Sequence, residues 1–272
     1  MPPRRAAVVL RRALQQGRQS LIQAPAPLLG FSACACGLHL LGWALFAAGH
    51  LGEGSALTLL LNLAGVVVYT GSIVWLVQGL TRGGLAAARG VRPQWRDLVR
   101  WRSREALALL GSLLAAGGCI LLAGLVGFVA WSLATFVLPA FSVIPALLAL
   151  VLVTAASLSQ LFVACLLLDA GLSPSSAVRS GIVGFERCWP FCLGLGLASG
   201  LILLLPFAAG FLAEALVSGL GVAITVLAMV AALPLLSCTV TAGYLQLAPT
   251  LLRPEAPKSG AAGGRGWPDN NG

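Results

Sequence analysis

The chain has 272 residues, of which 58% are apolar and only 9% are charged, and its mean hydropathy is +0.95. A soluble globular protein of this composition would have too few charged residues for its surface, so lipid is the expected solvent. The net charge of +9 alone would also fit a nucleic-acid-binding protein. The positions of the arginines, taken up below, argue against nucleic acid as a partner.

Six apolar runs without an internal Asp, Glu, Lys or Arg follow one another along the chain. Each reaches or exceeds the roughly 20 residues that a helix needs to cross a ~30 Å hydrocarbon core. The pieces between them are too short for a soluble domain, so we predict an all-α membrane bundle of six transmembrane helices, arranged as three hairpins, over 28–252. The predicted spans are 28–50, 56–80, 106–136, 141–168, 190–213 and 215–247.

Basic residues alternate strictly with these spans. The counts of Lys and Arg in successive connections are 5, 0, 7, 0, 2, 0 and 3. Because cytoplasmic loops retain Lys and Arg, the pattern predicts a multi-pass protein of the inner or plasma membrane with both termini in the cytoplasm. Attraction of arginine to anionic headgroups explains the net charge, so membrane lipids, and no nucleic acid, are the predicted partners.

Residues 1–27 precede the first span. Arg4, Arg11 and Arg18 recur every seven residues, while leucines mark the opposite face. This spacing predicts an amphipathic helix that lies in the membrane interface.

The second connection carries a regular series of arginines. Pro93 suits the first turn of a helix, and Trp95, Leu98 and Trp101 line one side of it. The arginines recur every four residues at Arg92, Arg96, Arg100 and Arg104. We predict a second interfacial helix whose guanidinium groups meet lipid phosphate; the plainer alternative is a connector that only lies along the membrane.

A third interfacial helix is predicted before the fifth span. Ser173 is placed to cap it and Pro174 to occupy its first position. Its apolar face is formed by Val178, Ile182, Phe185 and Trp189. Asp169 lies just before this helix, where we expect it to pair with Arg179 or to cap.

Small residues and prolines mark the interiors of the later spans. Rows of small residues predict helix contacts at Gly111, Ala115, Cys119, Ala123 and Gly127 and at Cys192, Gly196 and Gly200. Kinks are predicted at Pro145, Pro206 and Pro234. The tail, 253–272, has no apolar pattern and is expected to be disordered.

Polar groups within the spans are few. His39 lies in mid-span, with Asn62 and Gln160 as uncharged companions. A histidine in this position most often hydrogen-bonds across helices, and a proton relay is the alternative. Broken or kinked spans around these three residues would fit a transporter site.

Catalytic patterns do not occur. The two histidines, His39 and His50, cannot supply a His-rich metal site or a Ser-His-Asp triad with a cytoplasmic base, and no phosphate-binding glycine loop is present. The seven cysteines include no CxxC pair and are expected to stay reduced as small apolar residues. We therefore predict that the chain is not an enzyme and has no catalytic residue, cofactor or metal.

Two stretches carry a family likeness: GSIVWLVQGLTRGGLAAARGVRPQWRDLVRW at 71–101 and DAGLSPSSAVRSGIVGFERCWPFCLGLG at 169–196. With the six-span plan, they resemble the bacterial family of glycerophosphoryl diester phosphodiesterase membrane domains and related six-span proteins. The enzymes of that name carry a soluble domain with paired histidines and metal-binding carboxylates, which we do not expect in this chain. The resemblance therefore implies a membrane module to which no catalytic residue can be carried over.

Two functions stay open from the sequence. The first is a non-enzymatic accessory or scaffold module whose interfacial helices bind anionic lipid or another membrane protein. The second is a transporter or channel subunit for a small uncharged or hydrophobic solute, built on His39, Asn62 and Gln160. The substrate, the partner and the oligomeric state do not follow from the sequence.

Overall fold

The computed structural model describes residues 2–50, 56–137 and 142–251, and these residues are almost entirely helical, with no strand among them. The helices in chain order are α1 (Pro3–Gln23), α2 (Pro25–His50), α3 (Ala56–Ala88), α4 (Trp95–Val99), α5 (Ser103–Val137), α6 (Val143–Ser159), α7 (Val163–Leu168), α8 (Pro174–Leu216) and α9 (Leu220–Leu251). The tail that we expect to be disordered lies outside the described residues.

Six of the helical stretches are long and apolar enough to cross a membrane. They are Pro25–His50, Ala56–Ala88, Ser103–Val137, Val143–Leu168, Pro174–Leu216 and Leu220–Leu251. The predicted all-α bundle of six spans is confirmed, and the chain is an integral, multi-pass membrane protein.

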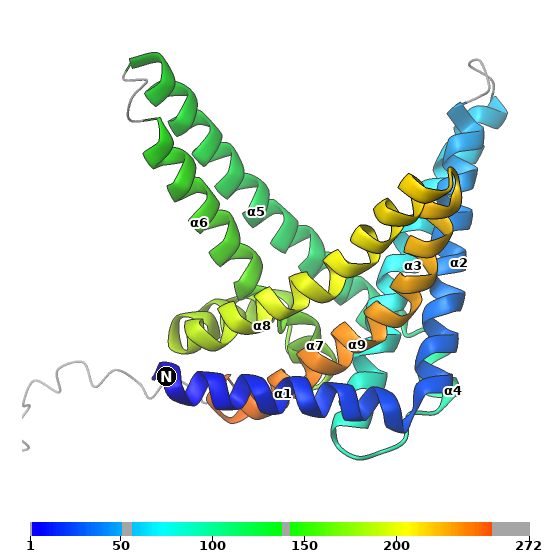
Figure 1. Cartoon of the computed structure of the whole chain (residues 1–272), viewed down its shortest axis with the longest axis horizontal. Helices are drawn as coiled ribbons and strands as arrows, with labels where there is room; N and C mark the ends of the chain where they lie inside the picture. The colour runs from blue at the N-terminus through cyan, green and yellow to red at the C-terminus, as the bar shows by residue number, and fades with distance from the viewer. Residues whose placement is uncertain (1, 51–55, 138–141, 252–272) are drawn as a thin grey trace, which may run out of the picture.

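The helices form two arms that diverge from a common base (Figure 1). The α5–α6 hairpin is one arm, and the α2–α3 and α8–α9 hairpins together make the other. The α8–α9 turn lies at the far end of its arm. The base holds α1, α4, α7 and the beginning of α8, and the described chain also begins and ends there (Figure 1).

Several helices depart from the predicted boundaries. The fourth span is divided after Ser159, where α6 ends, and α7 begins at Val163. Pro145 lies in the first turn of α6, where no backbone hydrogen bond is lost, so the predicted kink does not form there.

The bend in α8 also lies elsewhere than expected. Its one non-helical residue is Cys188 (φ −131°, ψ 27°), two positions before Pro190, whose ring displaces the carbonyl four residues earlier. The helix continues through Pro206, and α9 continues through Pro234. The interfacial segment and the fifth span are thus joined in one helix with a kink between them. Ser173 caps that helix as predicted, since its hydroxyl accepts from Ser176 N–H.

The predicted small-residue row of α5 is not a helix contact over most of its length. A Cβ added at Gly111 would meet open space, and Cys119 is exposed; only Gly127 packs closely, against Ala149 of α6. In α8, Cys192 is buried and Gly196 packs against Leu158, which confirms part of the second row.

A close backbone approach that the sequence did not indicate joins α2 to α3. A Cβ at Gly42 would lie 2.6 Å from Tyr69 N, and one at Gly65 would lie 2.7 Å from Phe46 N. The two helices therefore cross with their backbones nearly in contact, as close packing in lipid favours.

Candidate functional site

The base of the molecule gathers its basic residues. We call residues 3–23, 82–105 and 169–189 the arginine platform. It contains fourteen arginines against four carboxylates. The arginines are Arg4, Arg5, Arg11, Arg12, Arg18, Arg82, Arg89, Arg92, Arg96, Arg100, Arg102, Arg104, Arg179 and Arg187. No other part of the described chain has a Lys or Arg, so the two arms are without basic residues.

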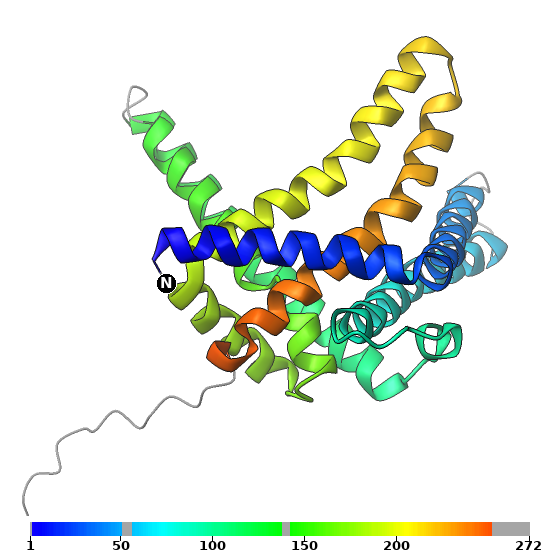
Figure 2. The ribbon, with the colours of Figure 1, turned by 60° about the horizontal axis from the view of Figure 1, so that its bottom comes forward.

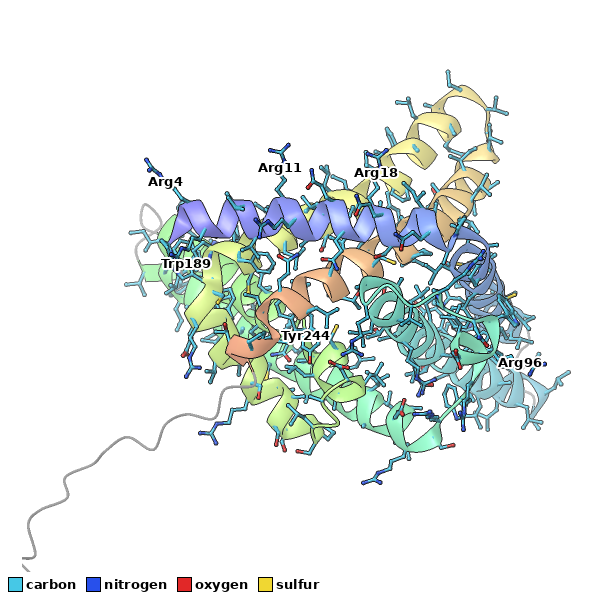
Figure 3. The ribbon with its side chains drawn as sticks, turned by 90° about the horizontal axis from the view of Figure 1, so that it is seen from below. Arg4, Arg11, Arg18, Arg96, Trp189 and Tyr244 are labelled. Carbon is cyan, nitrogen blue, oxygen red and sulfur yellow. The ribbon has the colours of Figure 1, made fainter. Side chains whose placement is uncertain are left out.

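The helix α1 lies along this base as predicted for an amphipathic helix, and it crosses the lower part of α9 (Figure 2). Its inner face is made of small residues: Ala13 is fully buried, and a Cβ at Gly17 would lie 2.7 Å from Thr239 Cα. Arg4, Arg11 and Arg18 project from the opposite face, away from the rest of the protein (Figure 3). The predicted helix therefore packs against α9 with its small-residue face and exposes its arginines on the other face.

A polar recess of about 670 Å³ opens between α1 and α9. It is lined by Val9, Arg12, Gln15, Gln16, Gln19 and Gln246. Gln16 is held in place because its Nε2 donates to Ala88 O at 2.8 Å. Amides and a guanidinium offer hydrogen bonds to a polar headgroup. The sequence feature that corresponds to this recess is the run of glutamines after Arg12.

Three side chains on one face of α3 hold the segment around α4. Trp75 Nε1 donates to Val99 O (3.0 Å), and Arg82 Nη1 donates to Arg100 O (2.6 Å). Gln78, which is fully buried, donates to Arg102 O at 3.2 Å. The spacing of three and four residues places these donors on one helix face. These three hydrogen bonds attach the segment around α4 to the C-terminal half of α3.

Glu105 of α5 binds at the same place. It forms ion pairs with Arg82 and with Arg102, the latter at 2.8 Å, and the side chains of Arg82 and Glu105 are 16% and 25% exposed. Gln78 Nε2 lies 3.3 Å from the same carboxylate. This cluster links α3, the α4 segment and α5 at the point where the two arms meet.

Asp169 pairs with Arg89 instead of with Arg179, so the expected partner was wrong. The two residues are 80 positions apart, and the fold brings the end of α3 beside the end of α7. Asp169 and Glu105 are paired with arginines and only partly exposed, so Asp97 and Glu186 are the exposed carboxylates of the platform.

The arginine series at Arg92, Arg96, Arg100 and Arg104 does not lie on one helix as predicted. α4 has only five residues, so Arg92 and Arg100 lie outside it, and Arg104 belongs to α5. All four residues of the series are exposed, and none pairs with a carboxylate in the described part of the chain. Leu98 is completely buried between them, while Trp95 and Trp101 are about half exposed. The group thus surrounds a short anchored turn instead of following one helix face.

The three intramembrane polar residues do not converge. His39 packs against Ser72 and Tyr69, whereas Asn62 lies beside Gly49 at the far end of the same hairpin, ten residues or ~15 Å along α2. Gln160 lies at the break between α6 and α7, where its amide donates to Ser159 Oγ. His39, Asn62 and Gln160 therefore do not form one polar site of the kind that the transporter hypothesis requires.

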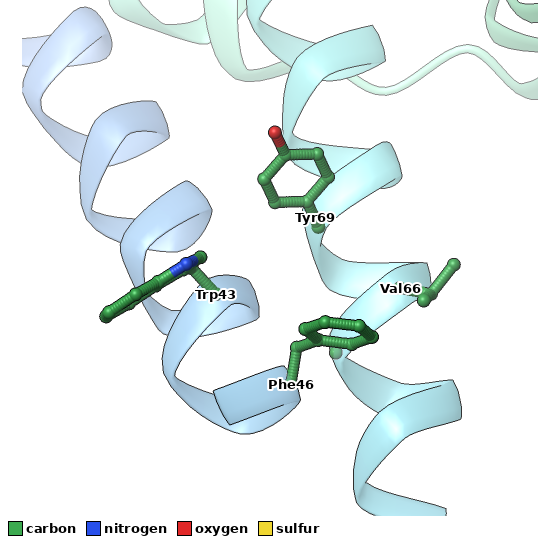
Figure 4. Close-up of a pocket in the computed structure, with 5 residues that line it drawn as sticks. Trp43, Phe46, Val66 and Tyr69 are labelled. Atoms are coloured by element: carbon green, nitrogen blue, oxygen red, sulfur yellow. The ribbon is translucent and has the colours of Figure 1, made fainter. Parts of the chain in front are cut away.

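The arms carry two further features away from the arginine platform. Glu214 accepts from Gly219 N–H and Gly221 N–H, both at 2.9 Å, and so fixes the α8–α9 turn at the far end. A cavity of about 350 Å³ lies on the α2–α3 pair, where Phe46 and Tyr69 face it (Figure 4). No cluster of three His, Cys, Asp or Glu residues suited to a metal ion occurs within the described ranges.

No protein-family model matches the chain, and neither a curated protein nor a solved structure is significantly similar to it. The arginine platform and the cavities between the spans are therefore interpreted from their own chemistry.

Proposed function

We propose that the protein is a non-enzymatic membrane module whose arginine platform binds anionic lipid headgroups, with the platform and both termini on the cytoplasmic side. The observation that carries the proposal is the charge distribution: fourteen arginines and four carboxylates at the base, two of these carboxylates already paired. An anionic membrane surface attracts each nearby arginine by about 1 kcal/mol.

The arrangement of the platform supports lipid more than a soluble partner. Trp95, Trp101 and Trp189 are about half exposed beside the arginines, as is typical of aromatic side chains at headgroup depth. The recess beneath α1 adds uncharged hydrogen-bonding groups next to Arg12. A headgroup needs this combination of phosphate-binding guanidinium groups and neighbouring amides.

The test compares lipid retention in purified protein. Arg92, Arg96, Arg100 and Arg104 are replaced together by Gln, and the ratio of retained phosphatidylglycerol to phosphatidylcholine is measured by mass spectrometry. Loss of four arginines is expected to lower the preference for phosphatidylglycerol by roughly two to three orders of magnitude at low salt, and by less at physiological ionic strength.

A matched control removes charge of the opposite sign from the same face. Asp97→Asn with Glu186→Gln should leave the preference unchanged or raise it, because these carboxylates are exposed on the platform. An unchanged lipid ratio in the four-arginine variant would contradict the proposal. Equal losses in both variants would point to a general loss of structure, which circular dichroism would reveal.

A further inference from the structure

His39 faces a cavity that the platform does not use. The cavity has a volume of about 290 Å³ and lies between the α2–α3 and α8–α9 hairpins. Its walls are mainly apolar, with Leu40, Ile73, Phe207 and Met229 among them. This size is near the lower end for small-molecule sites, which are apolar with a few polar groups that fix orientation.

The hydrogen bonds of Ser72 determine the tautomer of His39. Ser72 Oγ donates its only proton to Tyr69 O at 2.7 Å. His39 Nδ1 lies 3.2 Å from the same oxygen, so the tautomer that fits this arrangement carries its proton on Nδ1 and donates it to Ser72 Oγ. Ser72 is 5% exposed, so water does not compete for this bond. The remaining ring nitrogen, Nε2, is then a hydrogen-bond acceptor.

The Nε2 atom makes no hydrogen bond to any residue that the structure describes. Tyr69 holds the ring in place from one side, with ring centroids 4.1 Å apart. An acceptor without a partner in apolar surroundings costs about 1–3 kcal/mol, and a ligand that donates one hydrogen bond recovers part of that cost. None of the platform's arginines lines the cavity, so an anionic headgroup finds no counter-charge there.

We propose that this cavity binds a membrane-dissolved single-chain alcohol, whose hydroxyl donates to His39 Nε2 while its chain lies against the apolar walls. Thr225 also lines the cavity, and its hydroxyl proton is taken by Gly221 O at 2.8 Å. Two acceptors therefore face the ligand, and the only further polar group in the lining with a proton to offer is the weakly donating thiol of Cys36. This arrangement selects a hydroxyl over an ether, an ester or a plain hydrocarbon.

The experiment uses histidine labelled with nitrogen-15 in the full chain, reconstituted in phosphatidylcholine bilayers and observed by solid-state nuclear magnetic resonance. The chain has two histidines, so two imidazole rings appear, and His50→Phe assigns them. Without ligand, His39 is expected in the Nδ1-protonated form. Decanol should then shift the Nε2 signal of His39, whereas undecane, in which a methyl group replaces the hydroxyl, should leave it unchanged.

Binding of carbon-13-labelled decanol provides a second measurement. His39→Phe removes the acceptor while keeping a planar ring, and it should weaken decanol binding about fivefold, the equivalent of one hydrogen bond. Undecane binding should not change. Should His39→Phe fail to fold, Ser72→Ala replaces it in the test. This variant removes the partner of His39 Nδ1, so both tautomers of His39 should appear and decanol binding should weaken.

Three outcomes would overturn the inference. The first is a His39 ring protonated at Nε2 in the free protein. The second is a decanol shift of equal size at His39 and His50, which indicates general partitioning into the bilayer. The third is an identical response to decanol and undecane.

Discussion

The two arms of the molecule are both strongly apolar, yet they are held in different ways. In one arm, α2 and α3 cross at Gly42, Gly49 and Gly65, where an added Cβ would collide with the facing helix. In the other arm, Gly127 is the close contact between α5 and α6, and a Cβ at Gly111, Gly117, Gly118 or Gly124 would meet nothing within 4 Å. Hydropathy identifies both hairpins, but only side-chain shape separates a packed crossing from an exposed one.

The arms also differ in what lies beside them. The α2–α3 hairpin packs on α9 and on α4, and Phe31, Leu98 and Cys238 form a buried cluster there. The α5–α6 hairpin is joined to the rest mainly near the base, through α8, α3 and α7 (Figure 1). The position of the α5–α6 arm therefore depends on contacts at the base.

The largest expected effect comes from closing the space at the packed crossing. Gly42→Leu places side-chain atoms within 2.6 Å of the Tyr69 backbone, and overpacking of this kind should lower the free energy of unfolding by about 2–3 kcal/mol. Gly111→Leu is the matched change in the other arm, where leucine has open space and the better helix propensity. Thermal unfolding in detergent measures both variants; equal losses would contradict the difference between the arms.

The joint between the arms should respond next most strongly. Glu105→Gln removes the charge that Arg82 and Arg102 share. The site is partly exposed, so the expected loss of about 2 kcal/mol lies between that of a surface pair and that of a buried pair. Glu186→Gln is the control: this exposed residue of α8 should change the free energy of unfolding by less than about 0.5 kcal/mol. A neutral result for Glu105→Gln would mean that the joint does not depend on this cluster.

The features that the sequence predicted correctly are those set by local chemistry. Length and hydropathy located the six spans because a bilayer core requires a fixed helix length. Ser173 was identified as a cap because its hydroxyl needs only the N–H three residues later. The collection of the arginines at one end follows from their alternation with the spans.

The features that it missed depend on contacts distant in the chain. A spacing of four residues made Arg92 to Arg104 look like one helix. In the folded protein, the carbonyls of Val99 and Arg100, which such a helix would need, are taken by Trp75 and Arg82 of α3. In the same way, Asp169 meets Arg89 across 80 residues. Neither contact has a signal in local spacing.

The smallest of the three effects concerns a single hydrogen bond that fastens the α4 segment beside the packed arm. Trp75→Phe removes the donor to Val99 O, and it should lower the free energy of unfolding by about 1 kcal/mol. Trp101→Phe is the matched control, since this indole is about half exposed and makes no hydrogen bond within the described chain. Because the segment leads directly into α5, Trp75→Phe should also speed hydrogen exchange at 99–102 more than at the α2–α3 crossing. Equal exchange rates in wild type and variant would show that the α5–α6 arm is held at its base without this bond.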